Sequence, residues 1–388
     1  MKRILFIPHT YSHGGGAEKV LNTLIGELAK WYEIDIIERW EDDIFVYDLP
    51  HNVRRLKAMT YYPHIVNSMG WNKLYWILHR KILTILTVLF PRLVYTHYIK
   101  SKYDYEISFN YLYSAFLIAN SPNRKSIKIM WNHTDLYDLD YRRYSGFNRY
   151  VVMIKRAVQR NAFKHADQIV AISQNTYESI VSLFPFTSSY VSIILNGYRF
   201  EDFQMKSKEF PVEKTDRFRL IFVGRLEKRK NVICAVEAIN KVLESSTVNA
   251  ELLILGDGEC REYAEFVAKT HKGHFTFAGF KSNPYPFICS SDALILTSTN
   301  EGFPTVIIEA ISLGIPVITT RVGGVEEIIQ EGKNGLVVEN DYKKVAEGIC
   351  YMANHYDQFN NHIEETVSQF TAEKWGSRVK ELIEKMRS

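Results

Sequence analysis

Two positively charged side chains stand where a predicted strand gives way to a helix. Arg225 and Lys230 bracket the loop that follows the apolar run Arg219–Gly224. A diphosphate needs two cationic donors near a helix N-terminus, and Arg can bind it through two parallel hydrogen bonds. The loop also contains Lys228 and Arg229, so an ordinary solvated charged loop is the alternative interpretation.

Two carboxylates follow another apolar run, Asp292–Thr297. Glu301 comes soon after that run, and Glu309 lies within a helix predicted over Pro304–Leu313. Carboxylates that face one cleft suit ribose and sugar hydroxyls, which need hydrogen-bond acceptors. An exposed helix charge is the alternative for Glu309, but its neighbours are Ile and Ala, among which a carboxylate without a partner is costly.

Glycines follow the first predicted strand. Gly14, Gly15 and Gly16 precede a helix predicted over Ala17–Trp31. Glycines let a backbone approach a phosphate closely, and a helix N-terminus supplies N–H donors and the positive end of a dipole. The alternative is a tight strand-to-helix turn. The pattern is not G-x-G-x-x-G, and the second strand is not followed by a good candidate for the acidic residue that binds the ribose in dinucleotide-binding proteins.

A histidine follows the predicted strand Ser126–Trp131. His133 is flanked by polar residues, among them Asn132 and Asp135, at the point where the strand ends. This setting favours a role for His133 in a site, although a single histidine after an apolar strand is often structural. The role of Asp135 stays open between the same two interpretations.

Two series of alternating strands and helices position these residues. Residues 1–200 form the first series and residues 218–370 the second, and the charged stretch 201–217 between them contains Pro211. The strands are short continuous apolar runs, as expected when helices cover both faces of a parallel sheet. We therefore predict an α/β fold of two doubly wound, Rossmann-like domains facing across a cleft. The stretch 201–217 is the expected linker, and a final helix over 371–388 is expected to return to the first domain.

Ligands of such sheets bind beyond the carboxyl ends of the strands, which is where the candidate residues lie. The predicted strands span residues 3–8, 34–37, 105–110, 126–131, 167–173 and 191–195 in the first domain and 219–224, 251–255, 275–278, 292–297, 316–320 and 336–338 in the second.

The composition excludes several classes of protein. Of the 388 residues, 46% are hydrophobic and 24% are charged, which excludes a mainly disordered or fibrous chain. The net charge of +4 is small and does not favour a general nucleic-acid binder. None of the four cysteines forms a C-x-x-C pair, which favours reduced thiols in the cytoplasm and no zinc site. No signal peptide is expected, and the longest apolar stretch, residues 82–90, is about half of what spans a bilayer.

Residues 49–103 combine nine Lys or Arg and nine aromatic residues with no Asp or Glu. Basic, aromatic and apolar residues at helical spacing suit an element that lies in an anionic membrane interface. The alternative is an ordinary helix that packs its apolar side on the first sheet, and no nucleic-acid-binding motif accompanies the segment. The expected membrane contacts are Trp71, Trp76, Arg80, Lys81 and Arg92.

The motifs together resemble one enzyme family. The segment EGFPTVIIEAISLGIPVITTRVGGVEEII, residues 301–329, resembles the signature of retaining GT-B glycosyltransferases of family 4. GRLEKRKN at 224–231 is similar to the donor-diphosphate loop of that family, and HGGGAEKV at 13–20 and ILNG at 194–197 match it too. WNHTDL at 131–136 is typical of a bacterial subgroup that acts on envelope or capsular polysaccharides.

The resemblance implies roles for individual residues in the second domain. Arg225 and Lys230 would hold the donor diphosphate and stabilise the leaving nucleotide, and Glu309 would accept hydrogen bonds from the ribose hydroxyls. Glu301 would position the transferred sugar and a phosphate together with the backbone of Gly302, Phe303, Pro304 and Thr305. The base would lie near Gly256.

In the first domain, the resemblance implies that Gly15 and Gly16 close over the phosphates and that His133 lies near the sugar and the acceptor. The expected catalytic residues are therefore Glu301, His133, Arg225 and Lys230. Which glycine of 14–16 approaches the phosphates most closely is left open.

The activity implied by the resemblance is sugar transfer with retention of configuration. The donor would be a nucleotide diphosphosugar, a UDP-sugar rather than a GDP-sugar, and the acceptor a hydroxyl of a lipid-linked glycan in cell-surface polysaccharide biosynthesis. The enzyme would work without a divalent metal at the inner face of the cytoplasmic membrane. Asp138-Leu139-Asp140 has the letters of a metal-binding D-x-D motif but no nucleotide-binding strand pattern around it. The alternatives are a nucleotide-sugar epimerase on the same double-Rossmann plan and an inactive nucleotide-binding scaffold.

Overall fold

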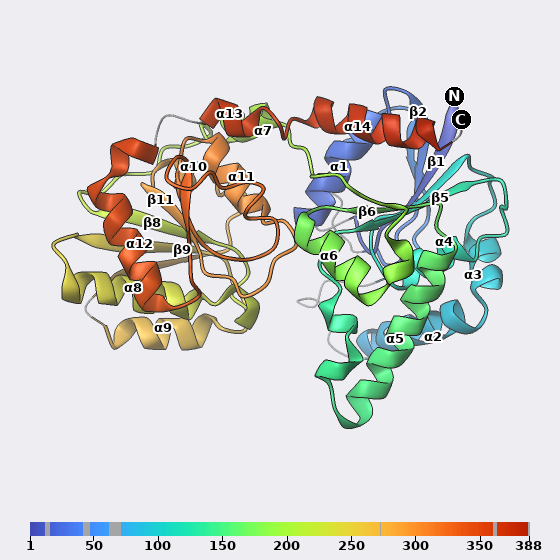
Figure 1. The fold of residues 1–388 in the computed structure, drawn as a ribbon, viewed down its shortest axis with the longest axis horizontal. Coiled ribbons are helices and arrows are strands. Elements are labelled where there is room, and N and C mark those ends of the chain that lie inside the picture. The colour runs from blue at the N-terminus through green and yellow to red at the C-terminus, as the bar shows by residue number, and fades with distance from the viewer. Residues whose placement is uncertain (12–15, 42–46, 62–70, 272, 360–362, 387–388) are drawn as a thin grey trace. The chain divides into compact units, whose positions relative to one another are not determined.

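The computed structural model describes residues 1–11, 16–41, 47–61, 71–271, 273–359 and 363–386. The chain folds into two compact units (Figure 1). Unit 1 comprises Met1–Tyr198 together with Ala372–Ser388, and unit 2 comprises Arg199–Thr371.

Unit 1 is built on a seven-stranded sheet in which every described pair of neighbouring strands is parallel. The strand order is β3-β2-β1-β4-β5-β6-β7. The strands are β1 (Lys2–Ile7), β2 (Tyr32–Ile36), β3 (Val53–Arg55), β4 (Tyr105–Ser108), β5 (Ile127–Asn132), β6 (Gln168–Ala171) and β7 (Val191–Ile193).

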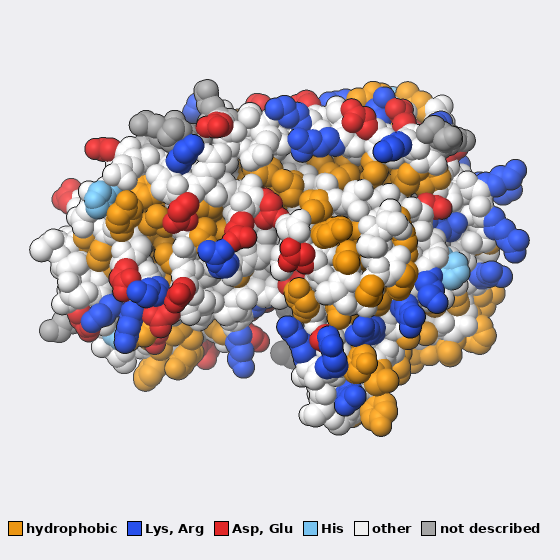
Figure 2. All heavy atoms as spheres, in the orientation of Figure 1, with side chains coloured by type: hydrophobic (Ala, Val, Ile, Leu, Met, Phe, Trp, Pro, Cys, Tyr) orange, Lys and Arg blue, Asp and Glu red, His pale blue; other side chains and the backbone are white. Residues whose placement is uncertain are grey.

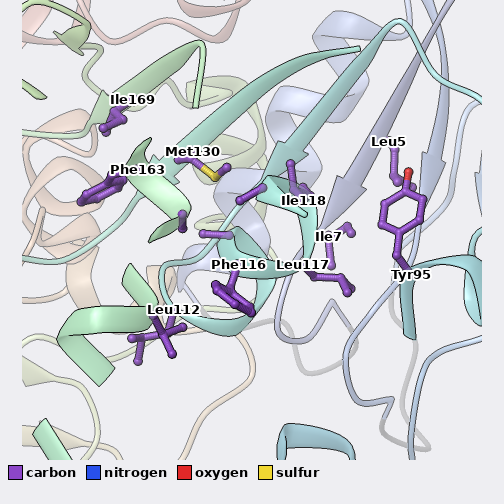
Figure 3. Packing of buried hydrophobic residues seen from close by; sticks show 14 of the residues in the cluster. Leu5, Ile7, Tyr95, Leu112, Phe116, Leu117, Ile118, Met130, Phe163 and Ile169 are labelled. Carbon is purple, nitrogen blue, oxygen red and sulfur yellow. The ribbon is translucent and has the colours of Figure 1, made fainter. Parts of the chain in front are cut away.

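Helices cover both faces of this sheet. Leu5 and Ile7 of β1 belong to a buried cluster with residues of α3, α4, α5 and α6, part of which Figure 3 shows. Ile4 and Phe6, which point to the other face, are equally inaccessible to solvent. The α-helices of unit 1 are α1 (Gly16–Leu28), α2 (Trp71–Leu89), α3 (Pro91–Tyr98), α4 (Tyr113–Ala119), α5 (Gly146–Lys164), α6 (Gln174–Leu183) and α14 (Ala372–Lys385).

The last helix of the chain, α14, packs in unit 1 rather than in the unit that precedes it in sequence. A Cβ atom at Gly376 would lie 2.6 Å from the Cβ of Glu27 in α1, so the two helices are in close contact. Trp375 meets Trp131 of β5 with their ring centroids 6.1 Å apart. This helix therefore helps to form the layer that covers one face of the sheet.

Unit 2 is built on a six-stranded parallel sheet with the order β10-β9-β8-β11-β12-β13. Its strands are β8 (Phe218–Val223), β9 (Ala250–Leu255), β10 (His274–Gly279), β11 (Ala293–Leu296), β12 (Val317–Thr320) and β13 (Gly335–Val338). Its α-helices are α7 (Phe200–Lys206), α8 (Val232–Ser245), α9 (Arg261–Lys269), α10 (Tyr285–Cys289), α11 (Thr305–Ser312), α12 (Tyr342–Asn354) and α13 (Ile363–Val367).

The stretch expected to be a linker, residues 201–217, differs from that prediction at its start. Helix α7 occupies its first residues and packs against α10 and α11. Phe203 stacks on Tyr285 with the ring centroids 5.1 Å apart, and the side-chain amide of Asn283 donates to the Lys206 carbonyl at 2.8 Å. Aromatic contacts at Phe200 and Phe203 therefore hold this part of the stretch in unit 2.

Both sheets reverse their strand order at one point. In unit 1 the reversal lies between β1 and β4, and in unit 2 between β8 and β11. In open parallel sheets the crevice at such a switch point, beyond the carboxyl ends of the strands, is the usual ligand site. The predicted α/β fold of two doubly wound, Rossmann-like domains is confirmed, and the loops after β8 and β11 become the first place to look for a site.

Candidate active site

The loop after β8 is shaped by a turn that ends in a left-handed residue. Residues Lys228–Lys230 form a 3₁₀ turn, and Asn231 then adopts φ 49° and ψ 46° before α8 begins. Asn is one of the residues that tolerates this conformation. The hydroxyl of Thr297 donates to the Asn231 carbonyl at 2.8 Å, which ties this loop to the end of β11.

The structure brings Lys230 and Glu301 together at the switch point of unit 2. The Lys230 Nζ lies 2.5 Å from Glu301 Oε1, which also accepts a 2.8 Å hydrogen bond from Ser298 Oγ. Arg229 reaches the other oxygen, Oε2, at 3.3 Å and the Asn300 carbonyl at 3.1 Å. The Glu301 side chain is only 8% exposed and that of Lys230 15%. A buried carboxylate is thus held by three donors from two loops.

Arg225 lies in the same loop but does not join this cluster. Its side chain is 75% exposed, and its guanidinium lies 3.4 Å from Glu227 Oε1. Arg229 binds the same oxygen at 2.8 Å. The structure therefore leaves the guanidinium of Arg225 accessible to a ligand, whereas Lys230 is already engaged by Glu301.

Gly256, the residue after β9, lets the loop after β9 touch the loop after β8. Its φ is 141°, and a Cβ atom there would lie 1.8 Å from the Gly224 carbonyl oxygen. The Gly256 N–H also donates to the Gly279 carbonyl at 2.9 Å. No side chain fits at this position, so the loops after β8, β9 and β10 meet through backbone atoms beside the site.

Residues 302–305 lead into helix α11. Phe303 is buried and meets Phe370 with ring centroids 5.9 Å apart, so its side chain serves packing. Gly324, at φ 76°, lies so close that a Cβ there would be 2.9 Å from the Gly302 carbonyl oxygen. Pro304 is the N-cap of α11 rather than its first residue, and Thr305 opens the helix. The first backbone N–H groups of α11 are those that lack a partner within the helix.

Glu309 lies on α11, buried to 7% exposure, and accepts a hydrogen bond from the Tyr285 hydroxyl at 3.3 Å. Burial, together with the charge of Glu309, raises the pKa of Tyr285 well above its usual range. Glu309 is therefore buried beside a polar partner rather than exposed on its helix, and that partner, Tyr285 of α10, was not identified from the sequence.

His133 follows β5 in unit 1 and sits among aromatic rings. Its ring centroid lies 4.1 Å from that of Phe109 and 6.4 Å from that of Trp131. Its Nε2 atom is buried and has no hydrogen-bond partner among the described residues. Burial lowers the pKa of His133 to about 3, so the imidazole is neutral at pH 7. Asp135 is buried and caps the next turn, its Oδ1 accepting from the Tyr137 N–H at 3.2 Å.

Other predicted residues have simple placements. Gly15 lies outside the described residues, and Gly16 is the first residue of α1. Both aspartates of the D-x-D letters have protein partners: Asp138 accepts from the Tyr111 hydroxyl at 2.9 Å, and Asp140 pairs with Arg142 at 2.8 Å. Within the described residues, no cluster of His, Cys, Asp and Glu has the arrangement of a metal site.

The residues predicted to contact a membrane divide into two groups. Trp76 packs on Tyr61 with ring centroids 5.4 Å apart, and the Arg80 guanidinium lies 4.7 Å from the Trp40 ring centroid, so both side chains pack against other parts of unit 1. Lys81 and Arg92 are exposed, while the side chain of Trp71 is outside the described residues. Over the described parts of the chain, no helix is both long and apolar enough to cross a bilayer.

Arg229 and Ser298 are site residues that sequence reasoning missed. Arg229 was expected in a solvated loop, yet it contacts Glu301 and Glu227. The signal that could have identified both residues is the strand order: β8 and β11 are neighbours, so the loops that follow them must meet at one edge.

Comparison with known proteins gives a family match for part of the chain. The sequence model described as "Glycosyl transferases group 1" matches residues 203–367. An uncharacterised glycosyltransferase of Methanocaldococcus jannaschii is 30% identical over 66% of this chain and 63% of its own length. The capsular polysaccharide biosynthesis glycosyltransferase CapM of Staphylococcus aureus is 27% identical over 54% of this chain and 57% of its own length. The chain thus spans less than two thirds of these relatives.

A third relative is matched over more of the chain. It is an alpha-1,4-N-acetyl-D-galactosaminyltransferase of Campylobacter jejuni named for a saccharide on PP-undecaprenol, 26% identical over 88% of this chain and 86% of its own length.

Solved structures match nearly all of the chain. Sucrose-phosphate synthase from Thermosynechococcus elongatus has a TM-score of 0.75 at 18% identity, covering 100% of this chain and 99% of that one. The Anabaena protein HepE, solved with UDP and glucose, has a TM-score of 0.66 at 15% identity, covering 99% and 100%. The chain therefore has the GT-B fold, and its residues 203–367 match the group 1 glycosyl transferases.

Proposed function

We propose that this protein is a retaining glycosyltransferase of cell-surface polysaccharide biosynthesis. It moves a sugar from a nucleotide diphosphosugar to a hydroxyl of a lipid-linked glycan. The observation that carries the proposal is the Lys230–Glu301 pair at the switch point of unit 2, beside the exposed Arg225 and the first turn of α11. The match of residues 203–367 and the names of the relatives support the same reaction class.

The diphosphate binds between the loop after β8 and the N-terminus of α11. Arg225 supplies a bidentate donor, Lys230 a point charge, and the α11 backbone a set of N–H groups. Before the donor arrives, Glu301 holds Lys230 in place at 2.5 Å. The phosphate then takes over this cation, which frees an oxygen of Glu301 to accept a hydrogen bond from the sugar. Charge that develops on the leaving phosphate is stabilised by groups that are already oriented.

Glu309 accepts hydrogen bonds from the ribose hydroxyls, and the base lies near Gly256. Tyr285 positions Glu309 by its 3.3 Å hydrogen bond. UDP is the expected nucleotide, in keeping with the UDP bound in the solved structure of HepE. The reaction needs no divalent metal in this proposal, because the cations of the loop after β8 meet the charge of the diphosphate.

The acceptor hydroxyl is oriented by unit 1. His133 is neutral and carries a buried Nε2 atom with no partner among the described residues, which suits a hydrogen bond with a sugar hydroxyl. The leaving phosphate accepts the proton of the attacking hydroxyl while the new bond forms on the same face of the sugar, so the configuration is retained.

A lipid-linked acceptor explains the outward surface of α2 and α3. Large apolar side chains run along it, each at least 38% exposed, and Lys81 and Arg92 are exposed beside them. Such a surface holds the protein on an anionic leaflet, where each cation contributes about 1 kcal/mol. The apolar residues of the α2–α3 surface are Leu74, Tyr75, Leu78, Ile82, Ile85, Leu86, Leu89, Phe90 and Leu93.

The test is turnover of donor sugars with and without acceptor. UDP-, GDP- and ADP-sugars are offered to the wild type, with EDTA present in a parallel series, and release of nucleoside diphosphate is measured. Slow donor hydrolysis with one base, insensitive to EDTA and accelerated by a polyprenyl-diphosphate-linked glycan, is the expected result. Epimerised sugar without release of nucleotide would establish the epimerase alternative, and no binding of any nucleotide would contradict the proposal.

A further inference from the structure

The N-terminal half of α5 exposes large apolar side chains that no described residue covers. Phe147 is 80% exposed, Tyr150 67%, Ile154 61% and Met153 44%. Positions 147, 150 and 154 are three or four residues apart, so these side chains lie on one face of the helix. They form an apolar ridge over two turns, which we call the α5 ridge.

The same face of the helix is buried further along. Val158 and Ala162 continue the four-residue spacing from Ile154 and belong to the core cluster of unit 1. In Figure 1 the N-terminal end of α5 extends below the rest of unit 1. The helix thus continues beyond the core that its apolar face packs against, and the α5 ridge is the exposed part of that face.

Basic residues predominate in the segment that carries the ridge. Residues 141–166 contain seven Lys or Arg and no Asp or Glu. Arg142, Arg143 and Arg149 are exposed at the same end of the helix, where Arg142 pairs with Asp140 at 2.8 Å. The Arg143 and Arg149 guanidiniums rest 5.2 Å and 5.5 Å from the ring centroids of Tyr137 and Tyr141. Apolar side chains next to exposed arginines match a surface with anionic headgroups outside and hydrocarbon inside.

The ridge belongs to the same layer of unit 1 as the α2–α3 surface. Helix α4 packs against α5 and also against α2 and α3. Figure 2 shows hydrophobic and Lys or Arg side chains gathered together in the part of the view where Figure 1 draws α2, α3 and α5. Two separate contacts on one rigid unit fix its orientation on a surface and bind more tightly than either alone.

We propose that the α5 ridge is a second membrane contact, which inserts Phe147, Tyr150 and Ile154 into an anionic leaflet beside the α2–α3 surface. This inference rests on the membrane part of the proposed function and adds a contact outside the 49–103 segment. With two contacts, unit 1 is held at a defined angle, with the edge of the sheet that carries His133 at a fixed height above the lipid.

The experiment measures how the protein partitions onto vesicles of neutral phosphatidylcholine and onto vesicles that also contain about 30% anionic phosphatidylglycerol, which imitates an anionic leaflet. The variant Phe147→Asn with Ile154→Asn should lower the partition coefficient on anionic vesicles about tenfold. The matched control is Tyr263→Asn with Phe266→Asn on α9, where both side chains are similarly exposed, at 58% and 64%, but lie among Glu262 and Glu265. This control should bind vesicles as the wild type does.

A second measurement reports insertion directly. The tryptophan added by Phe147→Trp should contribute fluorescence that lipids with brominated acyl chains quench. The tryptophan added by Phe266→Trp should contribute fluorescence that these lipids do not quench. Far-UV circular dichroism and thermal unfolding of each variant show whether unit 1, which carries α2 and α5, and unit 2, which carries α9, remain folded.

The outcomes separate the two proposals. If Leu78→Asn with Ile82→Asn releases the protein from vesicles and the α5 variant does not, the second contact is refuted and the α2–α3 contact stands. If the wild type ignores anionic vesicles yet turns over its donor, both membrane contacts are refuted and the transferase proposal stands. If the α5 variant instead converts a dimer into a monomer in sedimentation velocity, a second copy covers the ridge and the inference is overturned.

Discussion

The carboxyl edges of the two sheets hold different kinds of polar groups. In unit 2 the edge is charged and its charges satisfy one another, with Lys230, Arg229 and Ser298 all bound to Glu301. At the end of β5 in unit 1 the groups are neutral instead, and the buried polar atoms Trp131 Nε1, Asn132 Oδ1 and His133 Nε2 have no partner among the described residues. A ligand of Lys230 in unit 2 would have to replace an internal ion pair, whereas a ligand at the end of β5 in unit 1 could bond three atoms that have no partner among the described residues.

This difference is the basis on which we propose where the two substrates bind. A diphosphate can displace a carboxylate from a lysine because it carries more charge and offers more acceptor oxygens. A neutral sugar hydroxyl cannot, but it can both donate and accept, which suits neutral side chains in a buried edge. In the proposed function the charged donor binds unit 2 and the neutral end of the acceptor binds unit 1, and each prediction below alters one side of this comparison.

The largest effect is expected at Lys230. Lys230→Ala should lower kcat/KM about 100- to 1,000-fold, because a preorganised charge on the leaving group is lost. Lys228→Ala, two residues earlier in the same 3₁₀ turn, is the matched control and should retain activity within about twofold. Initial-rate kinetics with the accepted donor measure both. Equal losses in the two variants would mean that the loop acts only through its total charge.

Arg225→Ala should have a comparable effect on turnover and little on stability, because its side chain is 75% exposed. Thermal unfolding and kcat/KM are measured on the same preparation. Near-normal turnover in this variant would remove Arg225 from the diphosphate site and leave Lys230 as its principal cation.

Glu309→Gln should weaken nucleoside diphosphate binding by about 1.5–3 kcal/mol, the usual loss when a charged acceptor is removed from a hydrogen bond. Tyr285→Phe, which removes only the hydroxyl that orients Glu309, should lose about 0.5–1.5 kcal/mol. Calorimetry gives both values. An unchanged affinity in the Gln variant, with a lost affinity in the Phe variant, would show that Tyr285 and not Glu309 contacts the nucleotide.

Arg229 contacts Glu301 and Glu227, and in the proposed function it does not touch the substrate, so its removal should lower activity less than removal of Lys230 or Arg225. Arg229→Ala should lower kcat about tenfold with little change in KM, and Arg229→Lys should recover part of the loss. Steady-state kinetics at saturating donor distinguish this from direct binding, which would raise KM instead.

The buried, neutral imidazole of His133 leads to a prediction about how stability depends on pH. Burial lowers the pKa of His133 to about 3 in the folded protein, whereas an unfolded histidine titrates near 6.5. The unfolded state therefore binds a proton that the folded state does not, and the stabilising effect is complete above about pH 6.5 and is lost as the pH falls toward 3. His133 should contribute a slope of about 1.4 kcal/mol per pH unit in that window.

Replacing His133 by Asn should flatten this slope, and urea unfolding at pH 7, 6 and 5 measures it. Burial and the charge of Arg39 also lower the pKa of His9 to about 3. His9→Asn should therefore flatten the slope in the same way, and the effects of the two substitutions on the slope should add. His165→Asn is the control, because His165 is exposed. Parallel pH profiles for wild type and His133→Asn would show that the ring is accessible in solution.

Local sequence patterns predicted much of the fold because most of its strands are short, largely apolar runs. The run that contains Ile4 to Ile7 could only be a buried strand, and β8 and β11 were equally clear. Strand β3 was missed because three residues at the sheet edge, two of them Arg, carry no apolar signal. Helix α7 was missed because its packing depends on Tyr285, more than 70 positions away.

The sequence pointed to individual residues of the candidate site but not to the contacts between them. Lys230 and Glu301 were both expected in the donor site, yet their ion pair joins positions 71 apart and depends on β8 lying beside β11. Nothing local distinguishes Arg229 from Lys228, because their different partners come from the loop after β11. The α5 ridge was missed for the opposite reason: its spacing is that of an ordinary amphipathic helix, and only the exposure of Phe147 and Ile154 shows that the core does not reach them.

The most direct test of the central claim is a calorimetric cycle that isolates the diphosphate. The nucleoside diphosphate that binds wild type and its parent nucleoside are each titrated into wild type and Lys230→Ala. If Lys230 anchors the diphosphate at the β8–β11 switch point, the variant should bind the nucleoside diphosphate at least about tenfold more weakly and the nucleoside equally well. Equal losses for both ligands, or no loss for either, would contradict the account.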